Sequence, residues 1–462
     1  MDIDSIIQNA RHIHFIGIGG SGMFPLVQIL YKQGMKISGS DNNEGSIVDA
    51  ERAMGIAVAM GQSAGNIKAG IDLAVYSAAI AADNPELVFA RESGIPTIER
   101  SEMLGYITRQ YSRCICVAGT HGKTTTTAML TQILLDCGRD PSAVIGGKLP
   151  AIGGYGRAGG SDIMTCEACE FADTFLRLSP DIAVILNIDE DHLDHFGSLE
   201  NIIASFRRFA ENTDGPVILN GGDGNCLKMA HGLEKRMITF GIGAHHDYTA
   251  ANIRMISPVC TAFDLVYRGE TLCGLRVNVP GEHQVLNALA ACAAAIETGV
   301  TPGEIAQAIP NFRGAGRRFE VLGEINGITV ADDYAHHPLE IEVTLKAAAK
   351  MGYSAVWAVF QPFTYSRTAH MLDAFAKALS IADHVVMSKI MGGREQNTFG
   401  ISTADLAARI PGCVWFEGFP EIADYILRHA KPGDLVITMG CGDIYKCANM
   451  MIAKYNHKKL PD

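Results

Sequence analysis

The sequence has no apolar run long enough to cross a membrane, and it has no short repeat or low-complexity tract. Its first ten residues lack the basic and apolar regions of a secretion signal. Basic residues are outnumbered by acidic ones, 38 to 50, and the net charge of −12 argues against general nucleic-acid binding. A small anionic ligand held by local basic groups is still compatible with that charge. We therefore expect a cytosolic protein that neither binds nucleic acid nor inserts into a membrane.

A second cysteine pair at zinc spacing is also missing. Cys166 and Cys169 have CxxC spacing, but they follow a predicted strand and no partner pair occurs elsewhere. Twelve cysteines in a reducing compartment are typical of buried thiols rather than of a disulfide framework. We interpret the cysteines as structural.

The strongest functional signal is a glycine-rich loop made of Gly119, Thr120, His121, Gly122, Lys123, Thr124 and Thr125. The apolar run at 114–118 predicts a buried parallel strand before it, and the spacing at 126–137 predicts a helix after it. In such a loop the backbone N–H groups surround nucleotide phosphates, Lys123 neutralises their charge, and Thr124 binds Mg²⁺. ATP is the first ligand to consider. An ordinary glycine-rich turn is the alternative, which the placement of Gly-Lys-Thr at the helix start disfavours.

A second glycine-rich turn lies near the N-terminus. A predicted strand at 12–18 leads into Gly17, Gly19, Gly20 and Gly22, and a helix is predicted over 23–33. The next predicted strand, 35–38, is followed by Ser40 and Asp41. Glycines over a helix N-terminus, with an acidic residue about twenty positions on, are typical of a site for a dinucleotide or a nucleotide diphosphate. NAD, FAD and a UDP-sugar all fit this pattern, and a tight turn without a ligand is a further alternative.

The length and the order of these patterns predict an α/β protein with three domains, at 1–110, 111–312 and 313–462. We expect a Rossmann-like N-terminal domain, a central P-loop ATPase domain with a mostly parallel sheet plus a small antiparallel part, and a Rossmann-like C-terminal domain. Further strands are predicted at 73–77, 163–166, 182–187, 217–220, 328–331, 355–360, 384–387 and 435–439, a hairpin at 262–267 and 271–279, and a helix at 286–298.

Polar side chains follow several of the predicted strands, where ligands of parallel sheets gather. Glu167 follows one strand, and an acidic loop with His192 follows another. Together with Thr124, these two side chains are candidates for binding a metal ion near the γ-phosphate, and a solvated acidic loop is the alternative. Tyr334 and His336 follow a strand of the third segment, where they are candidates for lining a substrate pocket.

In chain order, the motifs GIGGSGM, GSD, GTHGKTTTT, EACE, NIDEDHLD, GEHQVLNALAA, GRRFE, DDYAHHP, FQPFTYSR and MGCGDIYK resemble the Mur ligases over nearly the whole chain. The phosphate loop is similar to the short form of that family, with two residues between its first two glycines rather than four. The resemblance implies a UDP-sugar domain, a central ATPase domain and a C-terminal domain that receives the amino acid. It also implies ATP- and Mg²⁺-dependent ligation of L-alanine to UDP-N-acetylmuramate, through an acyl phosphate, in peptidoglycan precursor synthesis.

The resemblance also implies roles for individual residues. The implied catalytic residues are Lys123, Glu167, His192 and Arg318, and the implied metal ligands are Thr124, Glu167 and His192. ATP is expected to contact the phosphate loop, with His283 and Asn287 near adenine. The implied UDP-sugar contacts are Gly17, Gly19, Gly20, Gly22, Ser40 and Asp41, and the implied amino-acid pocket contains Tyr334, His336 and Arg367.

The chain departs from the family pattern at three places. Phe363 stands where the family usually has histidine, and Cys169 replaces a common aspartate. Some relatives carry a carbamoylated lysine after the metal histidine, whereas this chain has Arg207 and Arg208, which form no such stable carbamate. We therefore expect no carbamate and no step that needs a histidine at position 363.

Two other functions stay open at this point. A nicotinamide-dependent oxidoreductase would use Gly17 to Gly22 and Asp41, but it leaves the phosphate loop unexplained. Within the ligases, an enzyme that joins a whole peptide to UDP-N-acetylmuramate for recycling has similar motifs. The sequence does not indicate an oligomeric state.

Overall fold

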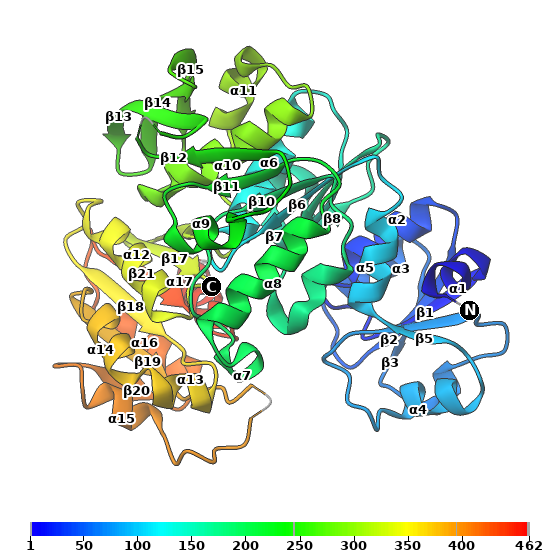
Figure 1. Cartoon of the computed structure of the whole chain (residues 1–462). Helices are drawn as coiled ribbons and strands as arrows, with labels where there is room; N and C mark the ends of the chain where they lie inside the picture. The colour runs from blue at the N-terminus through cyan, green and yellow to red at the C-terminus, as the bar shows by residue number, and fades with distance from the viewer. Residues whose placement is uncertain (1, 244, 394, 460–462) are drawn as a thin grey trace. The chain divides into compact units, whose positions relative to one another are not determined.

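The computed structural model describes residues 2–243, 245–393 and 395–459. The chain divides into two compact units. The first contains Met1–Ile253, Phe263–Arg276 and Val285–Phe312, and the second contains Arg254–Ala262, Val277–Gln284 and Arg313–Asp462. The described part of the chain forms three sheets with flanking helices (Figure 1). The predicted α/β fold with three domains is confirmed. The domain boundaries at 110/111 and 312/313 stay predictions.

The first sheet is parallel throughout and has the order β3-β2-β1-β4-β5. Its strands are β1 His12–Ile16, β2 Lys36–Asp41, β3 Ala57–Met60, β4 Leu73–Tyr76 and β5 Thr97–Glu99, and its helices are α1 Ile3–Asn9, α2 Phe24–Lys32, α3 Ser46–Ala53, η1 Ala64–Asn66, α4 Pro85–Glu92 and α5 Arg100–Thr108. The strand order reverses beside β1, between β2 and β4. Ligands of such sheets bind at this switch point, outside the carboxyl ends of the strands.

The second sheet has the order β15-β14-β13-β12-β11-β10-β6-β9-β7-β8. Its strands are β6 Arg113–Ala118, β7 Ser142–Leu149, β8 Gly154–Arg157, β9 Ile163–Glu167, β10 Ile182–Ile185, β11 Val217–Asn220, β12 Met237–Gly241, β13 Tyr248–Ser257, β14 Cys260–Tyr267 and β15 Glu270–Val277. The pairs from β7 through β13 are parallel, and β7–β8 is antiparallel. Arg268 and Gly269, both at positive φ, join β14 to β15 in a tight turn, so the predicted hairpin is confirmed.

The helices of this segment are α6 Lys123–Asp136, η2 Pro150–Ile152, η3 Phe171–Arg177, α7 Leu193–Phe196, α8 Leu199–Glu211, α9 Gly224–Ala230, α10 His283–Glu297, α11 Pro302–Ala308 and η4 Ile309–Asn311. Helix α6 packs against β6, β7 and β9. The buried residues of α6 include five threonines and Gln132 beside its apolar residues, and β6 is buried from its second residue to its end, so this packing fixes the loop between β6 and α6 at the sheet edge. One hydrophobic core extends through this sheet and the first one, from Ile13 and Phe15 to Cys116 and Met164.

The third sheet lies in the second unit and has the order β16-β17-β21-β18-β19-β20, with only β16 antiparallel to its neighbour. Its strands are β16 Glu320–Ile325, β17 Ile328–Asp333, β18 Val356–Phe360, β19 His384–Ser388, β20 Val414–Phe416 and β21 Leu435–Met439; its helices are α12 Pro338–Ala349, α13 Tyr365–His370, α14 Leu372–Leu379, α15 Thr403–Ala407, α16 Phe419–His429 and α17 Tyr445–Lys459. Two apolar clusters enclose it, one containing Ile341 and Phe375 and the other Ile422 and Met451.

All the predicted strands and helices occur, with shifted ends. Strand β2 continues through Ser40 and Asp41, which the sequence analysis placed after it, and Glu167 is the last residue of β9. The strands that the sequence patterns did not indicate include the short β3 and β8 and also the longer β7 and β13. Within the described part of the chain, none of the helices has the length and apolar character of a membrane span.

Candidate nucleotide and substrate sites

The loop between β6 and α6 depends on two glycines. Gly119 and Gly122 have φ of +146° and +84°, in the left-handed region that side chains rarely adopt. A Cβ at Gly119 would lie 2.9 Å from the Leu186 Cβ, and one at Gly122 would lie 2.7 Å from Asn287 Oδ1. Neither glycine therefore tolerates a side chain. Helix α6 begins immediately afterwards at Lys123, so its N-terminal N–H groups face the loop.

Asn187 holds the loop against the end of β10. Its Oδ1 accepts the His121 N–H at 2.8 Å, and its Nδ2 donates to the His121 carbonyl at 3.0 Å. The Thr120 N–H donates to the Asn187 carbonyl at 3.1 Å, and the Asp189 N–H donates to Thr120 Oγ1 at 2.8 Å. The Thr120 side chain and the His121 backbone thus belong to the loop's scaffold. No sequence pattern had indicated Asn187 as a functional residue.

Lys123 is held inside the loop by a buried carboxylate. Its Nζ donates to the carbonyls of Gly119 and Thr120 at 2.5 and 3.1 Å, and it lies 2.9 Å from Glu170 Oε2. Glu170 is 3% exposed. Burial alone would lower the pKa of Lys123, but the Glu170 carboxylate, together with Cys169 and Glu167, raises that pKa above its usual range. The lysine is therefore a permanent cation, as phosphate binding requires.

Thr124 and Glu167 lie side by side at the same sheet edge. The Thr124 hydroxyl donates to Glu167 Oε1 at 3.0 Å, and the Gly146 N–H donates to Oε2 at 2.7 Å. A Cβ at Gly146 would lie 2.6 Å from the carboxylate, so glycine is needed there. Hydroxyl and carboxylate oxygens are the ligands that Mg²⁺ prefers, usually one or two from the protein plus phosphate oxygens. The pair fits such an ion.

His192 lies at a strained position at the start of α7, with φ of +53°. Its ring packs 4.8 Å from the ring of Phe171, and its Nε2 is 3.7 Å from Asp191 Oδ2. Within the described ranges, no three or more acidic, histidine or cysteine side chains form a metal cluster. A metal ion bound by Thr124 and Glu167 would therefore need further ligands, such as the phosphate oxygens of a nucleotide. The role of His192 stays a prediction.

The other predicted ATP residues occupy different settings. Thr125 is buried in the first turn of α6, and Asn287 is buried in α10 with its Oδ1 close to Gly122. His283 is exposed at the start of α10 and lies in the second unit, where Gln284 Nε2 is 3.0 Å from its Nε2. Their contacts with adenine stay predictions.

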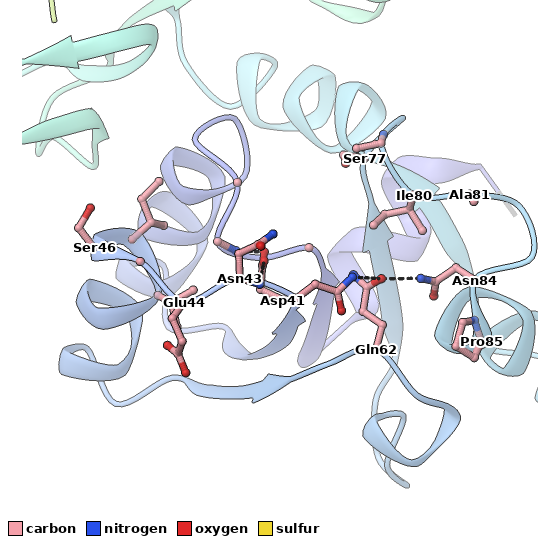
Figure 2. A pocket seen from close by; sticks show the side chains of 18 of the residues that line it. Asp41, Asn43, Glu44, Ser46, Gln62, Ser77, Ile80, Ala81, Asn84 and Pro85 are labelled. Atoms are coloured by element: carbon pink, nitrogen blue, oxygen red, sulfur yellow. Dashed lines mark hydrogen bonds between the residues drawn. The ribbon is translucent and has the colours of Figure 1, made fainter. Parts of the chain in front are cut away.

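A pocket of about 850 Å³ lies over the switch point of the first sheet (Figure 2). Gly17, Gly19, Gly20 and Asp41 line it, together with the segment 42–48, Gln62 and most residues of 77–85. The Gly19 N–H donates to Asp41 Oδ2 at 3.0 Å, and a Cβ at Gly19 would lie 2.7 Å from Val48. The volume is in the range of sites for small molecules.

Two of the predicted UDP-sugar residues lie outside this lining. The Ser40 side chain is buried and donates from Oγ to Glu86 Oε2 at 2.6 Å, within a polar network that also contains His14. Gly22 lies near Arg100, whose Nη1 would be 3.5 Å from an added Cβ. The structure therefore gathers Gly17, Gly19, Gly20 and Asp41 around one cavity, but not Ser40 and Gly22.

In the second unit, Arg318, Tyr334 and His336 form one aromatic and cationic cluster. The Arg318 guanidinium carbon is 4.9 Å from the Tyr334 ring centroid, and the His336 ring is 5.4 Å from it, edge to face. His336 Nδ1 is 3.1 Å from Glu340 Oε2. Arg317 also lies over Tyr334, but its Nε donates to the buried Asp332 at 2.9 Å.

The sequence analysis did not identify Asp333 as the residue that fixes this cluster. Its oxygens accept the N–H groups of Phe319 and Ala335 at 2.7 Å each, and these two residues directly follow Arg318 and Tyr334 in the chain. Burial raises the pKa of Asp333 to about 6, although Arg318 opposes the shift. Arg367 lies half-buried in α13, and its N–H donates to the capping Thr364.

The chain matches known proteins from end to end. Three family profiles follow one another along it: Mur ligase family, catalytic domain, over 12–112; Mur ligase middle domain over 117–295; and Mur ligase, glutamate ligase domain over 317–442. A protein named UDP-N-acetylmuramate--L-alanine ligase, from Lachnospira eligens, is 45% identical over 445 residues, which are 95% of this chain and 97% of the relative.

Solved structures show the same arrangement. The UDP-N-acetylmuramate-alanine ligase of Thermotoga maritima superposes with a TM-score of 0.83 at 29% identity, covering 97% of this chain and 100% of that one. A murein peptide ligase of Psychrobacter arcticus shares the fold, with a TM-score of 0.74 at 24% identity over 98% of this chain and 100% of that one.

Proposed function

This chain belongs to the Mur ligase family, and from that premise we propose that it ligates L-alanine to UDP-N-acetylmuramate, with ATP converted to ADP and phosphate. The observation that carries the proposal is the meeting of Lys123, Thr124 and Glu167 around one glycine loop at the edge of the central sheet. The choice of substrates is supported by full-length relatives that bear this activity in their names. The reaction would take place in the cytoplasm, where ATP is available.

Two displacements make the amide bond. The lactyl carboxylate of the sugar attacks the γ-phosphorus in line, and ADP leaves with the electron pair of the broken P–O bond. The amine of L-alanine then attacks the acyl carbon, and phosphate leaves with the bridging oxygen. Lys123 and the N–H groups at the start of α6 stabilise the charge that shifts among the phosphate oxygens during the first displacement.

Thr124 and Glu167 are the side chains that would hold Mg²⁺, with His192 as a third candidate. The ion would neutralise phosphate charge and orient the γ-phosphate. Glu170 keeps Lys123 aligned through the buried ion pair, and Asn187 keeps the loop closed on β10. No side chain has to act as a nucleophile.

The substrates would bind on either side of the ATP loop in the sequence. In the first domain, the turn at Gly17, Gly19 and Gly20 would receive the diphosphate and Asp41 the ribose, as in other nucleotide folds of this topology. In the second unit, Arg318 would face the transferred phosphate, and Tyr334, His336 and Arg367 would receive L-alanine.

The test is ADP release by the purified chain with ATP, UDP-N-acetylmuramate and L-alanine, omitting each in turn. We expect release only with all three present and no change at the reduced-nicotinamide absorbance band. A murein tripeptide supplied instead of alanine separates the rival recycling activity. Faster ligation of the tripeptide than of alanine would overturn the proposed amino-acid substrate, and oxidation of a nicotinamide would overturn the reaction class.

A further inference from the structure

Three amide side chains form a connected group at one end of the pocket in the first domain. Gln62, two residues beyond the end of β3, lies between Asn84 and Asn42. Asn84 Nδ2 donates to Gln62 Oε1 at 2.6 Å, and Asn42 Nδ2 donates to the same oxygen at 3.3 Å. All three residues line the pocket. Figure 2 shows Gln62 and Asn84 facing each other. None of them was singled out in the sequence.

The backbone of α4 fixes which way these amides point. Asn84 is the N-cap of α4, and its Oδ1 accepts the N–H groups of Glu86 and Leu87 at 3.0 and 3.2 Å. Because that oxygen is committed to two backbone donors, the Nδ2 of Asn84 must face Gln62. A donor facing Gln62 in turn selects the oxygen of Gln62 as the partner. The Gln62 amino group, Nε2, is then the polar atom left to offer hydrogen-bond donors to a ligand.

The position of Gln62 relative to Asp41 indicates which part of a nucleotide it meets. The glycine turn after β1 is the place for phosphate, and the carboxylate at the end of β2 is the place for ribose. Asp41 pairs in register with Met60 of β3, and Gln62 follows that strand, one strand farther from the glycine turn. The next group of a nucleotide beyond its ribose is the base. Its edge far from the sugar carries an oxygen at position 4 in uracil and an amino group in cytosine.

We propose that Gln62 reads the base of the UDP-sugar, donating from Nε2 to the oxygen at position 4 of uracil, and that Asn84 is the positioning residue that fixes this polarity. The inference rests on the proposed function, which supplies the nucleotide. A donor locked in this orientation binds a carbonyl oxygen and opposes an amino group, so it selects uridine over cytidine nucleotides.

The two residues can be tested without disturbing the fold. Gln62→Leu removes the donor. Asn84→Asp keeps an oxygen for Glu86 and Leu87, because aspartate caps helices as well as asparagine does, but it removes the donor to Gln62. The carboxylate would instead attract the Gln62 amino group and turn its oxygen toward the pocket. Gln33→Leu is the matched control, since Gln33 is an exposed amide of the same domain, paired with Gln110 outside the pocket.

The measurement is calorimetric binding of UDP and of CDP to the full-length protein and its variants, with steady-state kinetics alongside. We expect the wild type to prefer UDP, Gln62→Leu to weaken UDP binding about tenfold and CDP binding less than threefold, and Asn84→Asp to abolish or reverse the preference. The KM for the UDP-sugar should rise in both variants, while kcat at saturation and the KM for ATP stay unchanged.

Two results would overturn the inference: unchanged UDP affinity in both variants, or equal losses for UDP and CDP. The ligation assay separates this failure from failure of the proposed function. An active ligase with unaffected variants keeps the function and refutes the role of Gln62. A chain that binds UDP with the expected pattern but forms no amide refutes the function and keeps the role of Gln62.

Discussion

A buried carboxyl group in α3 should make the first domain less stable as the pH rises. Glu51 is fully buried, and neither of its oxygens has a hydrogen-bond partner among the described residues. Burial, and then the negative charge of Asp41, raise its pKa from 4.5 to about 8. Folded protein therefore keeps the Glu51 proton up to about pH 8, whereas unfolded protein releases it near pH 4.5.

The sign and size of the effect follow from proton linkage. Between these two pKa values the folded state binds more protons, so stability is fully present below pH 4.5 and is lost as the pH rises through 8. Each pH unit well inside that window costs about 1.4 kcal/mol, and the cost per unit falls near pH 8 because half of the folded molecules have then lost the proton, so the loss between pH 6 and pH 8 is about 2 kcal/mol. Glu51→Gln cannot ionise, and it should therefore lose this dependence.

The assay must report on α3 itself. Both tryptophans, Trp357 and Trp415, lie in the second unit, so their fluorescence does not follow this helix. Hydrogen exchange of the peptide covering 46–54 does. Relative to Glu51→Gln, wild-type protection should fall about 30-fold from pH 6 to pH 8, as 2 kcal/mol requires. Glu92→Gln, at an exposed carboxylate of the same domain, should behave like wild type. Equal pH dependence in wild type and Glu51→Gln would refute the reasoning.

The nucleotide and amino-acid sites give three further expectations. Lys123→Ala should lower the ligation rate by at least about 10²- to 10³-fold with the fold retained, and a folded variant with most of its rate would contradict the ATP site. Glu170→Gln removes the anion that holds Lys123 and repels phosphate, so kcat should fall about tenfold without a rise in the KM for ATP; a tenfold higher KM would show that Glu170 assists nucleotide binding. Phe363→Leu, which keeps an apolar side chain, should leave kcat within about tenfold when L-alanine is titrated at saturating ATP, and a larger collapse would place Phe363 in the chemistry.

Local patterns in the sequence were enough to predict many of the strands and the phosphate loop, although strands such as β7 and β13 were not predicted. Buried strands such as β6 and β21 are continuous apolar runs, and the loop's glycines and lysine have a fixed spacing because a turn of that shape needs them. The carboxyl ends of parallel strands share an edge, so Thr124 and Glu167 could be expected to meet.

Contacts set by tertiary packing could not be predicted in this way. Glu170 is buried against Lys123, 47 positions away in the chain, and a glutamate in a polar stretch of sequence gives no sign of such burial. The asparagine that orients Gln62 comes from another strand–helix connection, 22 residues away. Ser40 belongs to a motif that suggests ligand contact, yet its hydroxyl faces the buried Glu86, because successive residues of a strand point to opposite faces.

The central claim is that the sugar's carboxylate is activated as an acyl phosphate, and isotope transfer tests it most directly. UDP-N-acetylmuramate labelled with ¹⁸O at both lactyl carboxylate oxygens would be ligated to L-alanine, and the released phosphate analysed by mass spectrometry. The account predicts one ¹⁸O atom in each phosphate released, because the bridging oxygen of the acyl phosphate leaves with phosphorus, and the other ¹⁸O in the amide carbonyl. Phosphate without label, formed while the amide product accumulates, would contradict it.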